Sequence, residues 1–245
     1  MSGNIDAPVK VIAAFIDILG FSNLIEQSEE NWGNAMEKLH KIEEHIEANF
    51  LINSFEGATV RIFSDNVYFS IPISENINEK QIYDIAWFVR QIYELQWFFL
   101  DSEIFIRGGV AVGTQYISNT TLFGTALLKA YRAESQQAKY PRIILGESLI
   151  ELLTSLNGCT PIRNCGCLYT KDNEGITYMD YMSLWDDWSW EEDFKHKIFV
   201  RHRDIIANQI TTISDKKILE KYKWLIEYHN TYAKKYNCEI HNIDI

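Results

Sequence analysis

Two apolar runs, each interrupted by one aspartate, limit most strongly what this chain can fold into. The run at residues 15–21 reads Phe-Ile-Asp-Ile-Leu-Gly-Phe and contains Asp17, and the run at residues 60–69 contains Asp65 between two stretches of β-branched and aromatic residues. Such stretches favour β-strands, and a carboxylate buried in a strand costs free energy unless a partner compensates its desolvation. We therefore expect Asp17 and Asp65 at strand ends or turns, close together if the two strands are neighbours.

Two carboxylates that meet in this way indicate a site for a hard divalent cation, because such ions prefer oxygen ligands. The alternative is that each aspartate only forms a turn or caps a helix, which are common positions for this residue. Asp17 does not have the pattern of a cap, since no helical period begins after it. Asp65 lies between Ser64 and Asn66, where we predict a tight hairpin. The pair favours the metal site.

The composition argues against some classes of partner. The 245 residues carry a formal net charge of -11, whereas nonspecific binding of nucleic acid or of an anionic membrane needs a basic face. The N-terminus lacks the basic and apolar segments of a secretion signal. Residues 85–100 form the most apolar long stretch, but Arg90 and Glu94 interrupt it, so we predict a core helix rather than a membrane span. We expect a cytoplasmic protein with no nucleic-acid or membrane partner, in which an anionic ligand needs metal ions or arginines at its site.

The cysteines and histidines form no pattern typical of catalysis or metal binding. Cys165 and Cys167 are separated by one residue, which is not the usual spacing of a zinc site, and we expect the four cysteines to be reduced. The six histidines are scattered and form no HExxH motif. Histidine-based catalysis is therefore not expected.

The order of the predicted elements indicates an α+β fold. Along the first 145 residues, apolar runs and helical spacing alternate as β-α-β-β-α-β, followed by a further helix and strand. We predict one ferredoxin-like βαββαβ domain with extra strands, residues 1–184, and a helical C-terminal extension, residues 185–245. The predicted strands are 9–18, 58–63, 67–71, 103–112, 114–118 and 141–145, with others near 168 and at 177–182, and the predicted helices are 31–50, 78–100 and 124–138, with more helix in 185–236.

Three motifs resemble those of the class III nucleotidyl cyclases. Residues 15–21 resemble the first metal motif of that family. Arg61, Ser64 and Asp65 match the spacing of the second motif, in which a lysine and a glycine usually precede the aspartate. Residues 123–132 match the spacing of the family's helix motif of glycine, valine, asparagine, alanine and arginine. The motifs occur in the expected order and on the expected elements.

Further segments resemble, more narrowly, the pyrimidine cyclases of the bacterial Pycsar anti-phage systems. These segments are Arg-Gly-Gly at 107–109, Ala-Tyr and Glu-Ser within 130–135, Tyr-Pro-Arg-Ile at 140–143 and Tyr-x-Asp-Tyr at 178–181. The resemblance extends to about residue 185. It implies an enzyme that converts UTP or CTP to the 3′,5′-cyclic monophosphate and pyrophosphate.

The resemblance implies roles for the residues of the first two motifs. Asp17 and Asp65 would bridge two divalent cations, Mn²⁺ or Mg²⁺, which lower the pKa of the attacking ribose hydroxyl and neutralise the leaving pyrophosphate. The carbonyl of Ile18 would complete the cation shell. The backbone N–H groups of Gly20 and Phe21 would bind phosphate oxygens.

Arg132 stands where the family places its transition-state arginine. A fixed guanidinium aimed at the α-phosphate contributes typically about 10²- to 10³-fold to the rate. The alternative is a solvent-facing helix arginine that is loosely paired with a carboxylate. Leu128 replaces the asparagine expected to orient the ribose, so that role is vacant or filled from elsewhere. The sequence does not indicate which lysine or arginine binds the triphosphate.

Arg61 and Thr121 occupy the positions at which the family reads the base. They match neither the lysine and aspartate of adenylyl cyclases nor the glutamate and cysteine of guanylyl cyclases. An arginine offers several donors, which suit the carbonyl-rich edge of a pyrimidine. The alternative is that Arg61 pairs with a carboxylate on the neighbouring strand. Arginine alone does not separate uracil from cytosine, and we expect UTP because uridylate cyclases are the larger branch of the resembling family.

The expected function is therefore that of a uridylate cyclase, which makes cyclic UMP as a second messenger for anti-phage defence, sensed by a separate effector protein. In the resembling enzymes two chains pack head to tail, so that the metal carboxylates of one chain face the helix arginine of the other, and we expect a homodimer with shared sites. The alternatives are a cytidylate cyclase, an adenylyl cyclase, and a cyclase-like nucleotide-binding domain without turnover, which Leu128 would favour.

Overall fold

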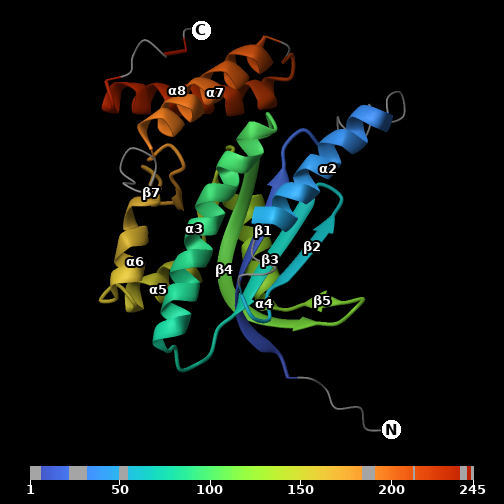
Figure 1. The fold of residues 1–245 in the computed structure, drawn as a ribbon, viewed down its shortest axis with the longest axis vertical. Coiled ribbons are helices and arrows are strands. Elements are labelled where there is room, and N and C mark those ends of the chain that lie inside the picture. Colours follow the sequence, from blue (N-terminus) through green and yellow to red (C-terminus); the bar gives the residue numbers. More distant parts are fainter. Residues whose placement is uncertain are drawn as a thin grey trace.

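The computed structural model describes residues 7–21, 32–49, 55–183, 191–211, 213–237 and 242–243. Its strands are β1 (Val9–Ile18), β2 (Thr59–Phe63), β3 (Asn66–Pro72), β4 (Ile106–Ile117), β5 (Leu122–Phe123), β6 (Ile143–Leu145), β7 (Tyr169–Lys171) and β8 (Thr177–Met179). They form one sheet in the order β2-β3-β1-β4-β6-β8-β7, and β5 pairs with β4 outside this path. The protein is thus a mixed α+β structure in which helices pack around a single sheet (Figure 1).

The long helices lie where the sequence predicts them, to within one or two residues. The described helices are α2 (Trp32–Asn49), α3 (Glu79–Asp101), α4 (Thr125–Gln137), α5 (Glu147–Ser155), α6 (Thr160–Asn164), the 3₁₀ helix η1 (Cys165–Cys167), α7 (Glu192–Ile210) and α8 (Lys216–Lys235). The sequence did not predict α5, α6 or η1, because helices this short depend on tertiary packing more than on their own periodicity. No helix in the described ranges combines the length and the apolar composition needed to cross a bilayer.

The central strand β1 is apolar from Val11 to Ile16 because both of its faces are covered there. It is antiparallel to β3 on one side and to β4 on the other. Ile12 and Ile16 point into the large core that includes Phe88 of α3. Phe15 points to the opposite face, where it packs with Ala130 of α4. Asp17, two residues after Phe15, therefore belongs to the α4 face of the sheet.

The strand β4 differs from the prediction, which divided it at Gly113. It begins at Ile106, three residues later than expected, and runs without a break to Ile117. The glycine has a packing role instead: a Cβ atom on Gly113 would lie 2.5 Å from the backbone nitrogen of Ala126. Gly113 therefore allows α4 to approach the sheet closely, and it does not end the strand.

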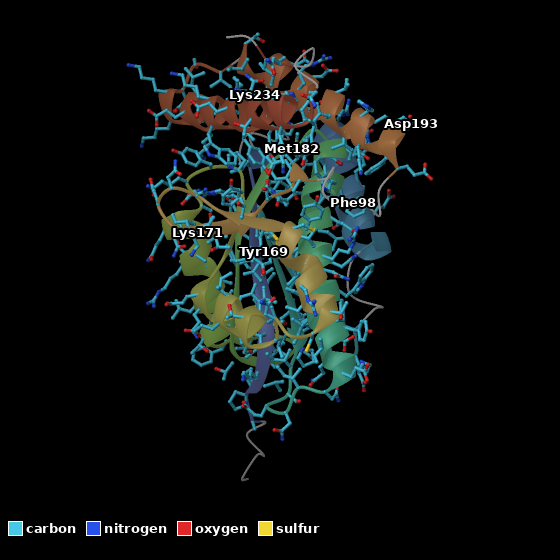
Figure 2. All side chains as sticks on the ribbon, turned by 90° about the vertical axis from the view of Figure 1, so that its left-hand side faces the viewer. Phe98, Tyr169, Lys171, Met182, Asp193 and Lys234 are labelled. Atoms are coloured by element: carbon cyan, nitrogen blue, oxygen red, sulfur yellow. The ribbon has the colours of Figure 1, made fainter. Side chains whose placement is uncertain are left out.

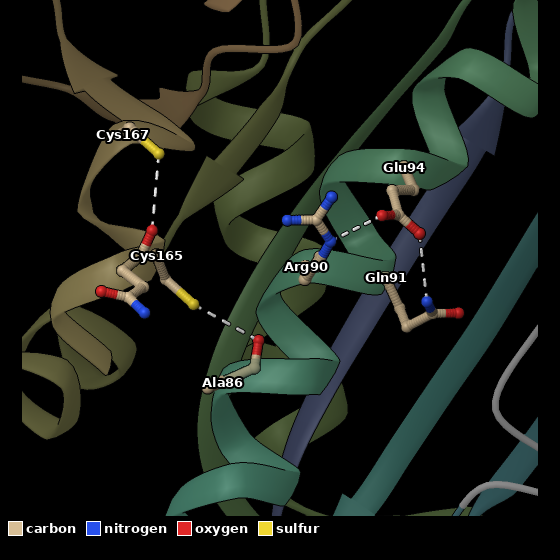
Figure 3. A network of polar contacts seen from close by, with 7 residues as sticks. Ala86, Arg90, Gln91, Glu94, Cys165 and Cys167 are labelled. Carbon is tan, nitrogen blue, oxygen red and sulfur yellow. Dashed lines mark hydrogen bonds and ion pairs between the residues drawn. The ribbon is translucent and has the colours of Figure 1, made fainter. Parts of the chain in front are cut away.

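Some polar groups of the apolar helix α3 are paired within the fold (Figure 3). Arg90 Nε donates to Glu94 Oε1 at 2.7 Å. The thiol of Cys165 in η1 donates to the carbonyl of Ala86 on α3 at 3.4 Å. Cys165 thus helps to hold η1 against α3. The fourth cysteine, Cys238, lies outside the described residues.

The helices α7 and α8 cross the end of the sheet at which β1 ends (Figure 1), and Figure 2 shows α8, with Lys234, above Met182. A buried carboxylate fastens α8 there. The hydroxyl groups of Tyr228 and Tyr232 both donate to Asp180, the former at 2.5 Å. The helices α7 and α8 agree with the helical character expected after residue 185. The expected domain boundary at 184/185 lies outside the described residues.

Two buried histidines join α7 to α8. His202 Nδ1 lies 3.0 Å from His229 Nδ1, and His202 Nε2 lies 2.9 Å from the hydroxyl of Tyr181. Burial, and then the neighbouring His229, lower the pKa of the His202 imidazole well below its usual value. His202 is therefore neutral at pH 7 and serves the packing of the C-terminal helices.

Candidate active site

The end of β1 and the β2–β3 hairpin bring Asp17 and Asp65 to one place. Asp17 pairs with Asn66, the first residue of β3, and the backbone N–H of Ile18 donates to the carbonyl of Asp65 at 2.8 Å. The hairpin turns tightly at Ser64, which has a positive φ of 56°. Both aspartates line a pocket of about 430 Å³. The two aspartates therefore lie on neighbouring segments and line the same pocket.

Arg107 of β4 connects Asp17 to α4. The two residues are directly paired across β1 and β4, and Arg107 Nε donates to Asp17 Oδ2 at 2.6 Å. The same nitrogen lies 2.9 Å from Glu134 Oε1. One guanidinium is thus shared by two carboxylates that come from different elements, and it orients both in a site with limited solvent screening.

Glu134 is the most buried acid of the pocket, with 4% of its side chain exposed. Burial raises the pKa of its carboxyl, Asp17 adds to the rise, and Arg107 opposes it. Its Oε1 atom receives no hydrogen bond from the described residues, because the single Nε hydrogen of Arg107 points to Asp17. The raised pKa favours the protonated form of the Glu134 carboxyl.

Lys221 brings α8 to the same pocket. Its half-buried side chain lines the cavity together with Asp17, Asp65, Arg107 and Glu134. Burial lowers the pKa of the ammonium, and Arg107 lowers it further, while nearby carboxylates partly offset the effect. The C-terminal helices therefore contribute a cation to the site.

The pocket contains oxygen atoms that fit a divalent cation. Asp17 Oδ2 is held by Arg107, and Asp65 Oδ1 accepts from the Asn66 amide at 2.6 Å. The other carboxylate oxygen of each aspartate accepts no hydrogen bond in the described part of the chain. Those residues include no group of three or more histidines, cysteines or acids that could hold a metal. An ion held by these two aspartates would need a carbonyl and substrate oxygens to complete its shell.

The turn after β1 exposes backbone donors beside the pocket. Gly20 has a φ of 80°, a conformation that glycine adopts without strain. The N–H groups of Ile18 and Leu19 are used by Asp65 and Phe105. Those of Gly20 and the buried Phe21 have no acceptor among the described residues. The two predicted phosphate donors are thus unpaired within the described part of the chain.

Arg61 lies away from this pocket, on the edge strand β2. It is exposed, and its Nη1 donates to the carbonyl of Val60 at 2.8 Å. The residue opposite it on β3 is Tyr68. The alternative interpretation of Arg61 as the partner of a cross-strand carboxylate is therefore wrong.

Thr121 and Arg132 also lie outside the pocket. Thr121 is in the turn between β4 and β5, where its N–H donates to Ser118 Oγ at 3.1 Å. This turn follows the far end of β4, roughly 30 Å along the strand from Arg107. Arg132 is exposed on α4 and forms no ion pair with the residues that the structure describes. A single chain does not bring Arg61, Thr121 and Arg132 to the two aspartates.

The Tyr-Pro-Arg-Ile and Tyr-x-Asp-Tyr segments lie mainly under the C-terminal helices. Arg142 is 3% exposed, forms an ion pair with Asp172 at 2.8 Å, and lies 4.7 Å from the ring centroid of Tyr178. Tyr140 stacks on Trp224 of α8, with ring centroids 5.2 Å apart and an interplanar angle of 4°. These residues fasten α8 to the sheet.

Three charged residues of the pocket, Arg107, Glu134 and Lys221, were given no site role from the sequence. Arg107 was detectable, because it interrupts an apolar strand as Asp17 does. Glu134 was a weaker signal, as an acid on the alanine-rich side of a helix. Lys221 had no signal, since it is one of several lysines on α8.

Comparisons with known proteins give little further information. No family model matches the chain, and no curated protein matches it. Among solved structures, the crystal structure of the guanylyl cyclase Cya2 is similar with a TM-score of 0.38 and 16% sequence identity, over 59% of this chain and 78% of that chain. A likeness at this level carries no argument about activity. A function for this chain can be proposed only from the geometry of the site.

Proposed function

We propose that this protein is a class III nucleotidyl cyclase that converts a pyrimidine nucleoside triphosphate, UTP in the first place, to the 3′,5′-cyclic monophosphate and pyrophosphate. The observation that carries the proposal is the meeting of Asp17 and Asp65 at adjacent strand ends in one pocket. The order β2-β3-β1-β4, with β1 antiparallel to both neighbours, supports a ferredoxin-like βαββαβ catalytic unit.

The proposal assigns the oxygen atoms of the pocket to metal binding. Asp17 and Asp65 would hold two ions, Mn²⁺ or Mg²⁺, with the carbonyl of Ile18. When bound, such ions lower the pKa of the 3′-hydroxyl and neutralise the leaving pyrophosphate. Arg107 holds Asp17 in place through the 2.6 Å hydrogen bond, so the carboxylate does not need to reorient when substrate enters.

The remaining assignments concern the nucleotide. The unpaired N–H groups of Gly20 and Phe21 would bind phosphate oxygens. Arg61 and Thr121 would contact the base. The guanidinium of Arg61 is exposed and is not paired with a carboxylate on β3, so its donors are available to the carbonyl groups of a pyrimidine. We expect UTP rather than CTP as the substrate only because of the resemblance to uridylate cyclases. The cyclic product would be a cytoplasmic second messenger in anti-phage defence, acting on a separate effector.

A head-to-tail homodimer would complete the site, because Arg132 and Thr121 lie outside the pocket of their own chain. Exposed apolar side chains surround these two residues on β5 and α4: Phe123 is 73% exposed, Leu128 45% and Tyr131 48%. Burying such side chains against a second copy is favourable. The proposed dimer therefore supplies the arginine and the base reader from the partner chain.

Turnover of nucleoside triphosphates tests the proposal. The full chain would be incubated with Mn²⁺ and each of UTP, CTP, ATP and GTP, with pyrophosphate release and the cyclic product measured by mass spectrometry. We expect cyclic UMP from UTP, and no product from the isosteric Asp65→Asn variant. Preference for CTP or ATP would replace the substrate assignment, and no release from any triphosphate by a folded sample would refute the enzyme.

Mixing two inactive variants tests the shared site. Asp65→Ala and Arg132→Ala should each be inactive, while a mixture should regain about a quarter of the wild-type activity, because half of the dimers are mixed and each has one intact site. If both variants are dimeric and their mixture stays inactive, the shared arrangement is wrong.

A non-catalytic nucleotide-binding domain is the second candidate. The ion pair between Asp17 and Arg107 favours it, since the guanidinium already compensates the carboxylate that a cation would need. The leucine at position 128, in place of the ribose-orienting asparagine, favours it as well. Tight binding of UTP without pyrophosphate release would identify this second function.

A further inference from the structure

Lys221 lies where the C-terminal helices reach the candidate active site. Its half-buried side chain lines the pocket that contains Asp17 and Asp65. It also lines a neighbouring pocket of about 470 Å³ between the turn after β1 and the connection from α7 to α8. The two cavities share the wall formed by Ile18, Leu19, Gly20 and Lys221.

The ammonium of Lys221 has no bonded counter-ion within the described ranges. Arg107, the other cation that lines the pocket with the aspartates, is held by Asp17 and Glu134 at 2.6 and 2.9 Å. Lys221 forms no comparable ion pair or hydrogen bond with the residues described. The lowered pKa of its ammonium, caused first by burial and then by Arg107, is consistent with a cation that lacks a close partner. Such a group suits a site that an anionic ligand completes.

Two backbone donors lie at or next to the shared wall, since Gly20 belongs to it and Phe21 lines only the second pocket. Gly20 lines both pockets, and a Cβ atom at this position would meet nothing within 4 Å. The N–H groups of Gly20 and Phe21 have no acceptor in the part of the chain that the structure describes, whereas those of Ile18 and Leu19 are used. Open space therefore coincides with N–H groups and an ammonium that have no partner among the described residues.

The acids of the second pocket limit how far an anion can enter. Glu103 and Asp215 line that cavity, whereas Lys221 is its one basic side chain among the described lining residues. Both acids are exposed, and their negative charges repel an anion that lies beside them. An anion is therefore most favourable at the shared wall, next to Lys221 and the turn after β1.

We propose that Lys221 joins the N–H groups already assigned to phosphate oxygens and binds the β- and γ-phosphates of the substrate, so that α8 is part of the active site. This inference is based on the proposed function, because it assigns the polyphosphate end of the same pocket. It gives the C-terminal helices a direct role in substrate binding, beside their packing on the sheet.

Binding of magnesium pyrophosphate to the full chain tests the inference. Isothermal titration calorimetry would compare the wild type with Lys221→Met, Lys221→Gln and Lys221→Arg. Lys223→Met is the matched control, because Lys223 is exposed on the same helix and lines neither pocket. Loss of a charge-assisted contact should weaken binding by about 10- to 100-fold in Lys221→Met and Lys221→Gln. Lys221→Arg should retain most of the affinity, and Lys223→Met should match the wild type.

The kinetics of UTP turnover give a second measurement. If Lys221 binds substrate and transition state alike, KM should rise in Lys221→Met more than kcat falls. Equal pyrophosphate affinity in Lys221→Met and Lys223→Met would overturn the inference, and so would the absence of pyrophosphate binding in the wild type. Lysine-dependent pyrophosphate binding without turnover of any triphosphate would instead support the subsite and refute the cyclase. Turnover that is unaffected by either lysine would support the cyclase and refute the subsite.

Discussion

Gly109 allows α4 to lie directly on β4, and a single added methyl group there should displace the helix. A Cβ atom built on Gly109 would lie 2.3 Å from the carbonyl oxygen of Ala130. It would also lie 2.7 Å from Ala133 Cβ and 2.7 Å from the backbone nitrogen of Glu134. Two of these atoms belong to the helix backbone, so they cannot turn aside as a flexible side chain can.

The expected cost of Gly109→Ala follows from these distances. The helix must withdraw by about 1 Å to restore a carbon–oxygen contact of about 3.3 Å, and a gap of that width loses roughly a quarter to a half of the dispersion attraction where it opens. Overpacking typically costs about 1–3 kcal/mol, and a clash with backbone places this variant at about 2–3 kcal/mol of unfolding free energy. For a chain of this size the melting temperature should fall by about 4–12 °C. The shift would also move Glu134 away from Arg107.

Urea unfolding followed by far-UV circular dichroism measures this cost. The control is Gly166→Ala, because Gly166 is exposed and its Cβ would meet nothing within 4 Å. The control should stay within about 0.5 kcal/mol of the wild type. A Gly109→Ala protein as stable as the control would refute the close packing of α4 on β4 at this glycine.

Three further predictions concern buried polar groups. The pKa of the buried His202 is lowered in the folded state, so the unfolded chain binds more protons and stability is lost as the pH falls below 6.5. The free energy of unfolding should therefore drop by about 1.4 kcal/mol between pH 7.5 and 5.5. This part of the pH dependence should be absent in His202→Leu. Tyr232→Phe removes a hydrogen bond to the buried Asp180 and should lower the unfolding free energy in urea by about 1.5–3 kcal/mol; an unchanged value would mean that this hydroxyl does not fasten α8. Arg107→Met removes the cation that opposes the raised pKa of Glu134, so the variant should lose about 1–3 kcal/mol of unfolding free energy at pH 8. This loss should shrink toward pH 4.5, where the Glu134 carboxyl gains a proton. A loss that does not depend on pH would contradict the ion-pair assignment.

Much of the sheet was predictable, because its information is local. The first strand was expected at 9–18 and is Val9–Ile18, since a continuous apolar run has only one way to be buried on both faces. The hairpin around Asp65 was also predictable from two short apolar runs and a polar turn. Gly113 was misjudged because a glycine in a strand can mark either a break or a close approach, and only the position of α4 decides between them.

The candidate site was predictable only in its aspartates. Asp17 and Asp65 each interrupt an apolar run, which is a signal readable in a few residues. Arg107 meets Asp17 across 90 positions of sequence, and Glu134 arrives from a helix on the α4 face. No local pattern contains such pairings, because they depend on strand register and on how closely a helix approaches the sheet.

The sequence by itself determined the central strand, the hairpin and the two aspartates, because burial of apolar residues and desolvation of a carboxylate act on neighbouring residues. Only the tertiary structure decided that Arg107 neutralises Asp17 and that Lys221 reaches the same pocket from α8. It also decided that Arg142 and Tyr140 fasten the C-terminal helices. The physical reason is that an ion pair or a stacked ring depends on distance in space, and chain folding sets that distance independently of separation along the sequence.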